Sequence, residues 1–129
     1  MKQTDNFKFD EANVMNELVY RNLSEDEKRQ ICAWKYGGEY DLYNLPSYEE
    51  MQVRQIGFMN PQREKNYYGF WDESILVGFV NILEEKEEVF IGIGVNPDLC
   101  NKHYGQRMLL ITYEISKKLY PNKPLYLEV

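Results

Sequence analysis

The sequence predicts a single α+β domain that has one mixed sheet with helices on both faces. Three stretches rich in aromatic and β-branched residues, 66–71, 75–83 and 88–95, are separated by turns of three or four residues. Such short turns require an antiparallel meander. A helical pattern separates the third stretch from a last one at 125–129, so these two strands are expected to run parallel. With 129 residues and 43% apolar content, the chain can close one core but not two.

The N-terminal part predicts an arm, a short strand and two capped helices. Residues 1–16 are polar and read as an arm or short helix ahead of a domain at 17–129, and residues 17–21 alternate like a strand. Ser24-x-x-Glu27 is a capping box that opens a helix ending near Gly37-Gly38. Ser47 opens a second helix in the same way, with Glu50 at the box position, and this helix is expected to reach about Phe58.

Composition excludes several classes of function. The net charge is 15 − 21 = −6, and no basic face is visible, which argues against a nucleic-acid partner. No apolar run approaches the roughly 20 residues of a membrane span, and the first residues lack the apolar core of a secretory leader, so a cytoplasmic protein is expected. Cys32 and Cys100 form no CxxC or CxxH pair and His103 is the single histidine, so no metal site is predicted and reduced thiols are expected.

The loop at 96–105 is the first candidate for chemistry. It leaves the carboxyl end of the strand 88–95 and enters a helix with apolar residues at Met108, Ile111, Ile115 and Leu119. Unpaired amides and the positive end of the helix dipole meet there, which suits a phosphate, although any strand-to-helix loop shares this geometry. Gly92 and Gly94 weaken the preceding strand, which predicts either a close approach to its backbone or a bulge that only curves the sheet.

The segment 91–109, with the sequence IGIGVNPDLCNKHYGQRML, resembles the acetyl-CoA-binding motif of the GNAT superfamily of N-acetyltransferases. The preceding meander and the aromatic stretch that begins at Trp34 also resemble that family, so the resemblance covers about residues 17–129. It implies a GNAT-like α/β (α+β) fold and acetyl-CoA as a co-substrate. In the family, strand main-chain groups pair with the pantetheine arm, and loop amides hold the pyrophosphate. The corresponding residues are Ile93, Gly94 and Val95 on the strand, and Cys100, Asn101, Lys102, His103, Tyr104, Gly105 and Gln106 in the loop.

The chain departs from the family pattern at several positions. Only Gly105 matches the three signature positions of the loop, because Cys100 stands in place of Gln or Arg and His103 in place of a glycine. A glycine there supplies positive φ and close approach, which a histidine tolerates less well. Some family members carry a general-base Glu where this chain has Val89, so no catalytic residue is assigned. The family's C-terminal helix and two further strands, which often supply the Tyr that protonates the thiolate, have no counterpart in these residues.

Four aromatic residues, Trp34, Tyr36, Tyr40 and Tyr43, resemble the acceptor-side loop of the family. Their rings could hold an amine through cation–π contacts. The alternative is that Trp34 and one or two of the tyrosines pack in the core, and for Trp34 this alternative is favoured. The last strand, with alternating Leu125, Leu127 and Val129, is expected to be an uncovered edge, which would favour a homo-oligomer.

The resemblance implies transfer of an acetyl group from acetyl-CoA to a primary amine of a small molecule or peptide. Two alternatives remain at this point. One is a non-catalytic, degenerate GNAT-like binding module completed by a partner chain. The other is a domain that binds a different phosphorylated ligand at the same helix end. Similarity of fold does not by itself decide between them.

Overall fold

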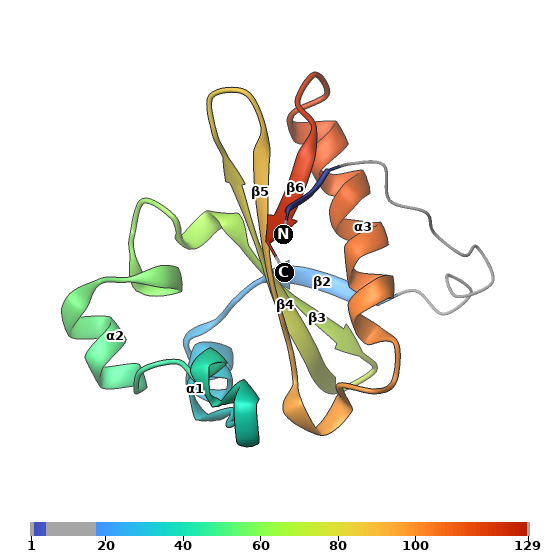
Figure 1. Ribbon diagram of the computed structural model, residues 1–129. Coiled ribbons are helices and arrows are strands. Elements are labelled where there is room, and N and C mark those ends of the chain that lie inside the picture. The colour runs from blue at the N-terminus through green and yellow to red at the C-terminus, as the bar shows by residue number, and fades with distance from the viewer. Residues whose placement is uncertain (1, 5–17, 129) are drawn as a thin grey trace.

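The computed structural model describes residues 2–4 and 18–128, and its centre is one six-stranded sheet (Figure 1). The strand order across the sheet is β1-β6-β5-β4-β3-β2. The strands are β1 (Lys2–Thr4), β2 (Val19–Asn22), β3 (Tyr67–Asp72), β4 (Ile75–Glu84), β5 (Val89–Val95) and β6 (Leu125–Glu128). The helices are α1 (Glu25–Ala33), α2 (Tyr48–Arg54) and α3 (Tyr104–Leu119), with short 3₁₀ helices η2 (Gly38–Tyr43), η3 (Gly57–Met59), η4 (Glu64–Asn66) and η5 (Pro97–Leu99).

The pairing of the strands confirms the predicted architecture. Strands β3, β4 and β5 form an antiparallel meander, and α3 then carries the chain back so that β6 runs parallel to β5. Among the described strands, β5–β6 is the one parallel pair; β2 and β1 pair antiparallel with β3 and β6. The two predicted turns and the crossover therefore lie where the sequence placed them.

Helices cover both faces of the sheet, as predicted (Figure 1). Helix α3 packs on one face, where Met108, Phe70 and Ile91 are at most 1% exposed. Helices α1 and α2 lie on the other face, in a second cluster built around Ile31 and Phe58, which are each 1% exposed. Burial of side chains of this size contributes about 1.5–3 kcal/mol each to folding. No helix within residues 2–4 and 18–128 is long and apolar enough to cross a bilayer.

The last strand differs from the expectation that it would be an uncovered edge. Strand β1 pairs with it antiparallel, from Lys2 opposite Glu128 to Thr4 opposite Tyr126. The exposed-edge argument for a homo-oligomer is therefore wrong, because the edge strands of the described sheet are β1 and β2. Three residues of the predicted arm thus belong to the sheet, while residues 5–17 lie outside the described residues. The division at residue 17 stays a prediction.

The two capping motifs, which look alike in the sequence, behave differently. At α1 the box is complete, since the Ser24 hydroxyl accepts from the Glu27 amide and the Glu27 carboxylate accepts from the Ser24 amide. At α2 only the Ser47 hydroxyl accepts from the Glu50 amide. The expected extent of α2 to Phe58 is wrong, because Gln55 adopts a left-handed conformation (φ 53°) and ends the helix.

The pairing of the sheet is regular at the glycines of β5, and its register shifts at one place between β3 and β4. Pairing of β4 with β5 continues without a shift from Gly78–Val95 to Glu84–Val89. A register shift occurs instead between β3 and β4, where Phe70 faces Gly78 but Trp71 faces Leu76. The bulge considered for Gly92 and Gly94 is therefore wrong, and close approach to the backbone is the explanation that remains.

Candidate functional site

Strands β5 and β6 run side by side for only two residue pairs, Val89 with Leu125 and Phe90 with Tyr126. Beyond them β5 continues to Val95, and Figure 1 shows it running on past the end of β6 toward the loop at the amino end of α3. Within the described residues, no strand pairs with the outer edge of β5 after Phe90. The open edge of β5 ends where the chain enters the loop before α3, which is where the sequence predicted the site.

The direction of each peptide group along this edge follows from one hydrogen bond. The Asn96 amide donates to the Val77 carbonyl at 2.8 Å, so even-numbered residues of β5 point their main chain at β4. Ile93 and Val95 therefore direct N–H and C=O groups to the open edge, whereas Gly94 directs them into the sheet. Of the three residues predicted to hold pantetheine through their main chain, two are placed for it, and that role stays a prediction.

Packing against Phe79 explains why residue 94 is a glycine. A Cβ atom at Gly94 would lie 2.8 Å from Cζ of Phe79 and closer still to Cε1, so the Phe79 ring covers this glycine. The same ring contacts Trp34, with centroids 6.3 Å apart. Trp34, predicted as an acceptor-side residue, thus lies half-buried against the sheet.

Tyr36 joins the acceptor-side stretch to the end of β5. Its hydroxyl donates to the Val95 carbonyl at 2.6 Å, and Asn44 holds its main chain by accepting from the Tyr36 amide at 2.6 Å. Burial, with a smaller contribution from Cys100, raises the pKa of Tyr36 to about 12, so the hydroxyl stays protonated as a donor. Tyr36 and the end of β5, which the sequence predicted as parts of two separate binding sites, are therefore in contact.

The loop between β5 and α3 is built on Asn96. Its side-chain oxygen accepts from the Asp98 amide at 3.0 Å, and its side-chain amide donates to the Leu76 carbonyl at 3.2 Å. The chain then makes one turn of η5 and reaches Cys100, whose thiol is exposed. Asn101 and Lys102, also predicted to bind cofactor, are exposed in the turn that follows.

His103 takes the conformation that a glycine would supply. It is left-handed (φ 64°, ψ 16°) and forms the N-cap of α3 without a side-chain hydrogen bond to the helix. The first turn carries no acidic residue, so no carboxylate of that turn competes for the amides that open the helix. Those amides belong to Tyr104, Gly105 and Gln106, and they lack partners within the helix. The helix end thus presents the donors and dipole that suit an anion.

Asp72 and Arg107, which the sequence analysis did not single out, both contact Tyr104 in the first turn of α3. The Tyr104 hydroxyl donates to the Asp72 carboxylate at 2.6 Å, which ties the first turn of α3 to the end of β3. This hydrogen bond is the main reason that the pKa of Tyr104 lies above its ordinary value. Arg107 lies over the Tyr104 ring, 5.2 Å from its centroid, and brings a positive charge to the same turn. Only the tertiary fold brings Asp72 to this place, so no local pattern could have shown it.

Tyr40 and Tyr43 remain exposed, unlike the other two predicted acceptor-side residues. They lie on η2 with 58% and 60% exposed surface, and their rings stack with centroids 6.5 Å apart. Residues i and i+3 overlap along a 3₁₀ helix, which explains the pair. The acceptor-side group therefore separates into two residues that pack inward and two that face solvent.

Among residues 2–4 and 18–128, the geometry identifies no catalytic acid or base. Val89 is fully buried, and the Glu-rich turn between β4 and β5 is a structural one, in which Glu84 pairs with Lys123 at 2.8 Å. Among the described residues, no group of three His, Cys, Asp or Glu side chains is placed to hold a metal ion.

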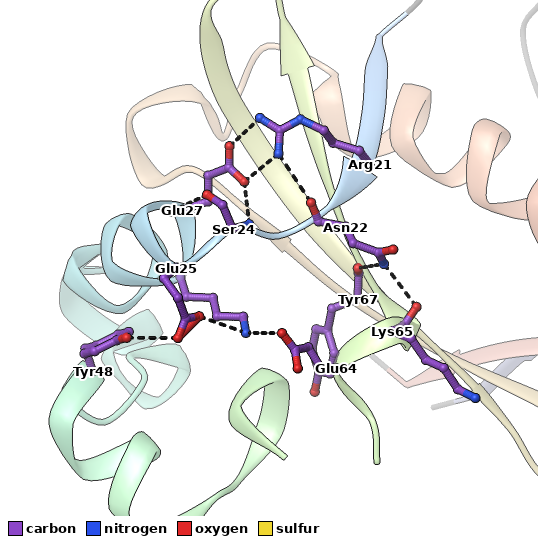
Figure 2. Close-up of polar contacts among 10 residues, drawn as sticks. Arg21, Asn22, Ser24, Glu25, Glu27, Tyr48, Glu64, Lys65 and Tyr67 are labelled. Carbon is purple, nitrogen blue, oxygen red and sulfur yellow. Dashed lines mark hydrogen bonds and ion pairs between the residues drawn. The ribbon is translucent and has the colours of Figure 1, made fainter. Parts of the chain in front are cut away.

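A polar network anchors α1, the helix that leads into Trp34 and Tyr36. Figure 2 shows Glu27 receiving both guanidinium arms of Arg21, at 2.9 and 2.7 Å. Lys28, with 3% of its side chain exposed, pairs with Glu25 at 3.0 Å and Glu64 at 2.8 Å. Burial alone would lower the pKa of Lys28, but the two carboxylates outweigh it and hold the pKa above its ordinary value. These contacts hold α1 between β2 and η4.

The fold matches that of a solved acetyltransferase-like structure. The crystal structure of a "putative acetyltransferase" from Pyrococcus horikoshii aligns with 88% of this chain at a TM-score of 0.55 and 15% identity. The chain therefore shares the fold of that structure. The alignment covers 37% of the Pyrococcus protein, so the chain spans a little over a third of that protein's length. No protein-family profile and no curated protein matches the sequence.

Proposed function

We propose that the protein binds acetyl-CoA between the open edge of β5 and the amino end of α3, and transfers the acetyl group to a primary amine. The GNAT-like fold supports acetyl-CoA as the donor. The single observation that carries the proposal is the uncapped start of α3, held by Tyr104 and Asp72, with Gly105 beside Val95 at the end of β5. The diphosphate of coenzyme A has the charge that such a helix end binds.

The residues of this chain would divide the binding between them. The amides of Tyr104, Gly105 and Gln106 would hold the diphosphate, with positive charge from Arg107 and Lys102 nearby. The Ile93 and Val95 main chain would pair with the pantetheine arm as a neighbouring strand does. In the transfer, the amine nitrogen forms a bond to the thioester carbon and the carbon–sulfur bond breaks with its electron pair on sulfur. The proton that the amine loses neutralises this thiolate, so the products are the amide and free coenzyme A.

His103 is the departure whose effect can be measured directly. Its main chain already has the left-handed conformation, so the difference from glycine is the imidazole. We expect the imidazole to restrict access to the helix end, and His103→Gly to bind acetyl-CoA more tightly than the wild type.

A melting experiment with acetyl-CoA tests the proposal. A ligand at a hundred times its dissociation constant stabilises the native state by about 2.7 kcal/mol, so the melting temperature must rise. His103→Gly should give a larger rise at equal ligand, while Tyr20→Leu, a substitution on the exposed edge strand β2, should match the wild type. No rise at millimolar acetyl-CoA for either protein would exclude acetyl-CoA binding.

The second candidate is a non-catalytic binding module, favoured by one observation. Val89, at the position where some relatives carry a base, is buried and apolar. Binding of acetyl-CoA without acetylation of any amine would support the module, whereas release of free thiol that depends on an added amine would support the enzyme.

A further inference from the structure

The loop from Tyr36 to Asn44 is a closed unit with an exposed aromatic tip. Asn44 accepts from the Tyr36 amide and donates to the Tyr36 carbonyl, at 2.6 and 3.4 Å, which closes the base of the loop. The Tyr36 hydroxyl fixes that base to Val95 at the end of β5. All six residues of η2, which form the tip, are exposed. The base of the loop is therefore fixed at the end of β5, beside the proposed acetyl-CoA site.

Apolar and aromatic side chains at the tip face solvent without packing against the cores. Tyr40 and Tyr43 stack on each other, and Leu42 beside them is 71% exposed. Exposed apolar and aromatic side chains that cluster at one point of a surface are unfavourable in water, and they often mark a binding site. We therefore consider that a ligand contacts these rings.

Acidic side chains accompany these rings in the sequence between Lys35 and Arg54. Residues 36–53 contain four acidic residues and no Lys, Arg or His. Two of the acids, Glu39 and Asp41, alternate with the aromatic residues of η2, and neither forms an ion pair with a described residue. Aromatic faces and unneutralised carboxylates both attract an organic cation. A protein partner would need an interface of about 800 Å² on each side, which two rings and two carboxylates do not supply.

We propose that the acceptor is a small aliphatic amine with a second positive charge, and that Tyr40 and Tyr43, with Glu39 and Asp41, bind that second charge. This inference rests on the proposed acetyl transfer and names the class of its acceptor. One amine loses a proton and reacts near β5, while the other stays protonated at the tip of the loop. The carboxylates of Glu39 and Asp41 are exposed to solvent, so the preference for a doubly charged amine should weaken with added salt.

The test compares diaminoalkanes of three to six carbons with monoamines of equal length. We expect kcat/KM for the best diamine to exceed that of its monoamine by about tenfold, which corresponds to about 1.4 kcal/mol. Tyr43→Leu and the double variant Glu39→Gln, Asp41→Asn should each reduce the preference for the diamine over its monoamine to about twofold. The matched controls are Tyr20→Leu and Glu49→Gln, which alter an exposed tyrosine and an exposed acid outside the loop tip.

Diamine binding, measured by calorimetry without acetyl-CoA, separates the two proposals. Acetylation of monoamines and diamines at equal kcat/KM would overturn the diamine inference and leave acetyl transfer intact. Absence of any acetylation would count against acetyl transfer, and the loop is then judged by whether Tyr43→Leu weakens diamine binding about tenfold. Binding that is equal in wild type and Tyr43→Leu would overturn the role of the loop in either case, as would better acetylation of a lysine-rich peptide than of any diamine.

Discussion

Substitution of Gly94 by alanine tests why β5 carries a glycine beside the open edge. The added Cβ would lie 2.8 Å from Cζ and 3.2 Å from Cδ1 of the Phe79 ring, whereas carbon atoms pack at 3.5–4.0 Å. The ring cannot simply move aside, because it also packs against Phe58, with centroids 6.1 Å apart, and Tyr67, at 6.4 Å. Overpacking of this kind costs about 1–3 kcal/mol.

Gly92 provides the matched control two residues earlier on the same face of the strand. A Cβ there would meet Phe90 at 3.3 Å, and that ring is only half-buried and can shift. Because glycine in a strand costs about 0.5–1 kcal/mol relative to alanine, Gly92→Ala should be neutral or slightly stabilising.

Urea unfolding measures the difference. With an m-value of about 1.5 kcal/mol/M, a loss of about 2 kcal/mol lowers the midpoint for Gly94→Ala by more than 1 M. The second substitution Phe79→Leu should recover part of that loss, since the two residues are in contact. Equal midpoints for Gly94→Ala and Gly92→Ala would refute the packing explanation. If Gly94→Ala kept its stability but lost affinity for acetyl-CoA, the glycine would serve the ligand instead.

Three further predictions concern the polar contacts around the site. Glu27→Gln removes the carboxylate that pairs with Arg21 and completes the capping box of α1, so we expect urea unfolding to show a loss of about 1–2 kcal/mol in the free energy of unfolding. Glu50→Gln changes an exposed residue at the half-formed box of α2, and should cost less than about 0.5 kcal/mol. Hydrogen bonding to Lys28 lowers the pKa of Glu25, and in Glu27 the hydrogen bonds from Arg21 and Ser24 outweigh burial and lower the pKa as well. Their stabilisation is complete above the unfolded pKa of 4.5 and is lost as the pH falls through the folded values, so the pH slope of unfolding below 4.5 should be shallower in Glu27→Gln; an unchanged slope would contradict this. Tyr104→Phe and Asp72→Asn should each cost about 1 kcal/mol and together less than the sum, while full additivity would show that the 2.6 Å hydrogen bond contributes nothing.

Local patterns predicted the elements whose signals are local. The meander follows from short turns between β-rich stretches, and the start of α1 follows from the Ser24–Glu27 box. The order strand, loop, helix, strand was enough to place the helix end next to β5, and to predict that β6 runs parallel to it.

Features that depend on contacts between distant residues could not be predicted. Tyr36 meets Val95 across 59 positions, and Tyr104 meets Asp72 across 32. Strand β1 is three polar residues long and has no periodicity that would show its pairing with β6. The early end of α2 at Gln55 could not be predicted either. A left-handed residue that ends a helix is usually Gly or Asn, whereas here it is a glutamine.

The hydrogen bond between Tyr36 and Val95 would couple the binding of the two proposed substrates, acetyl-CoA at β5 and the amine at the loop. A molecule that pairs with the end of β5 has to accommodate the phenol already bound there, and a molecule held by the loop moves the residue that carries that phenol. Whatever factor one ligand imposes on the affinity of the second, the second must impose on the first. Tyr36→Phe would remove this coupling, so that each ligand binds with the same dissociation constant whether or not the other is present.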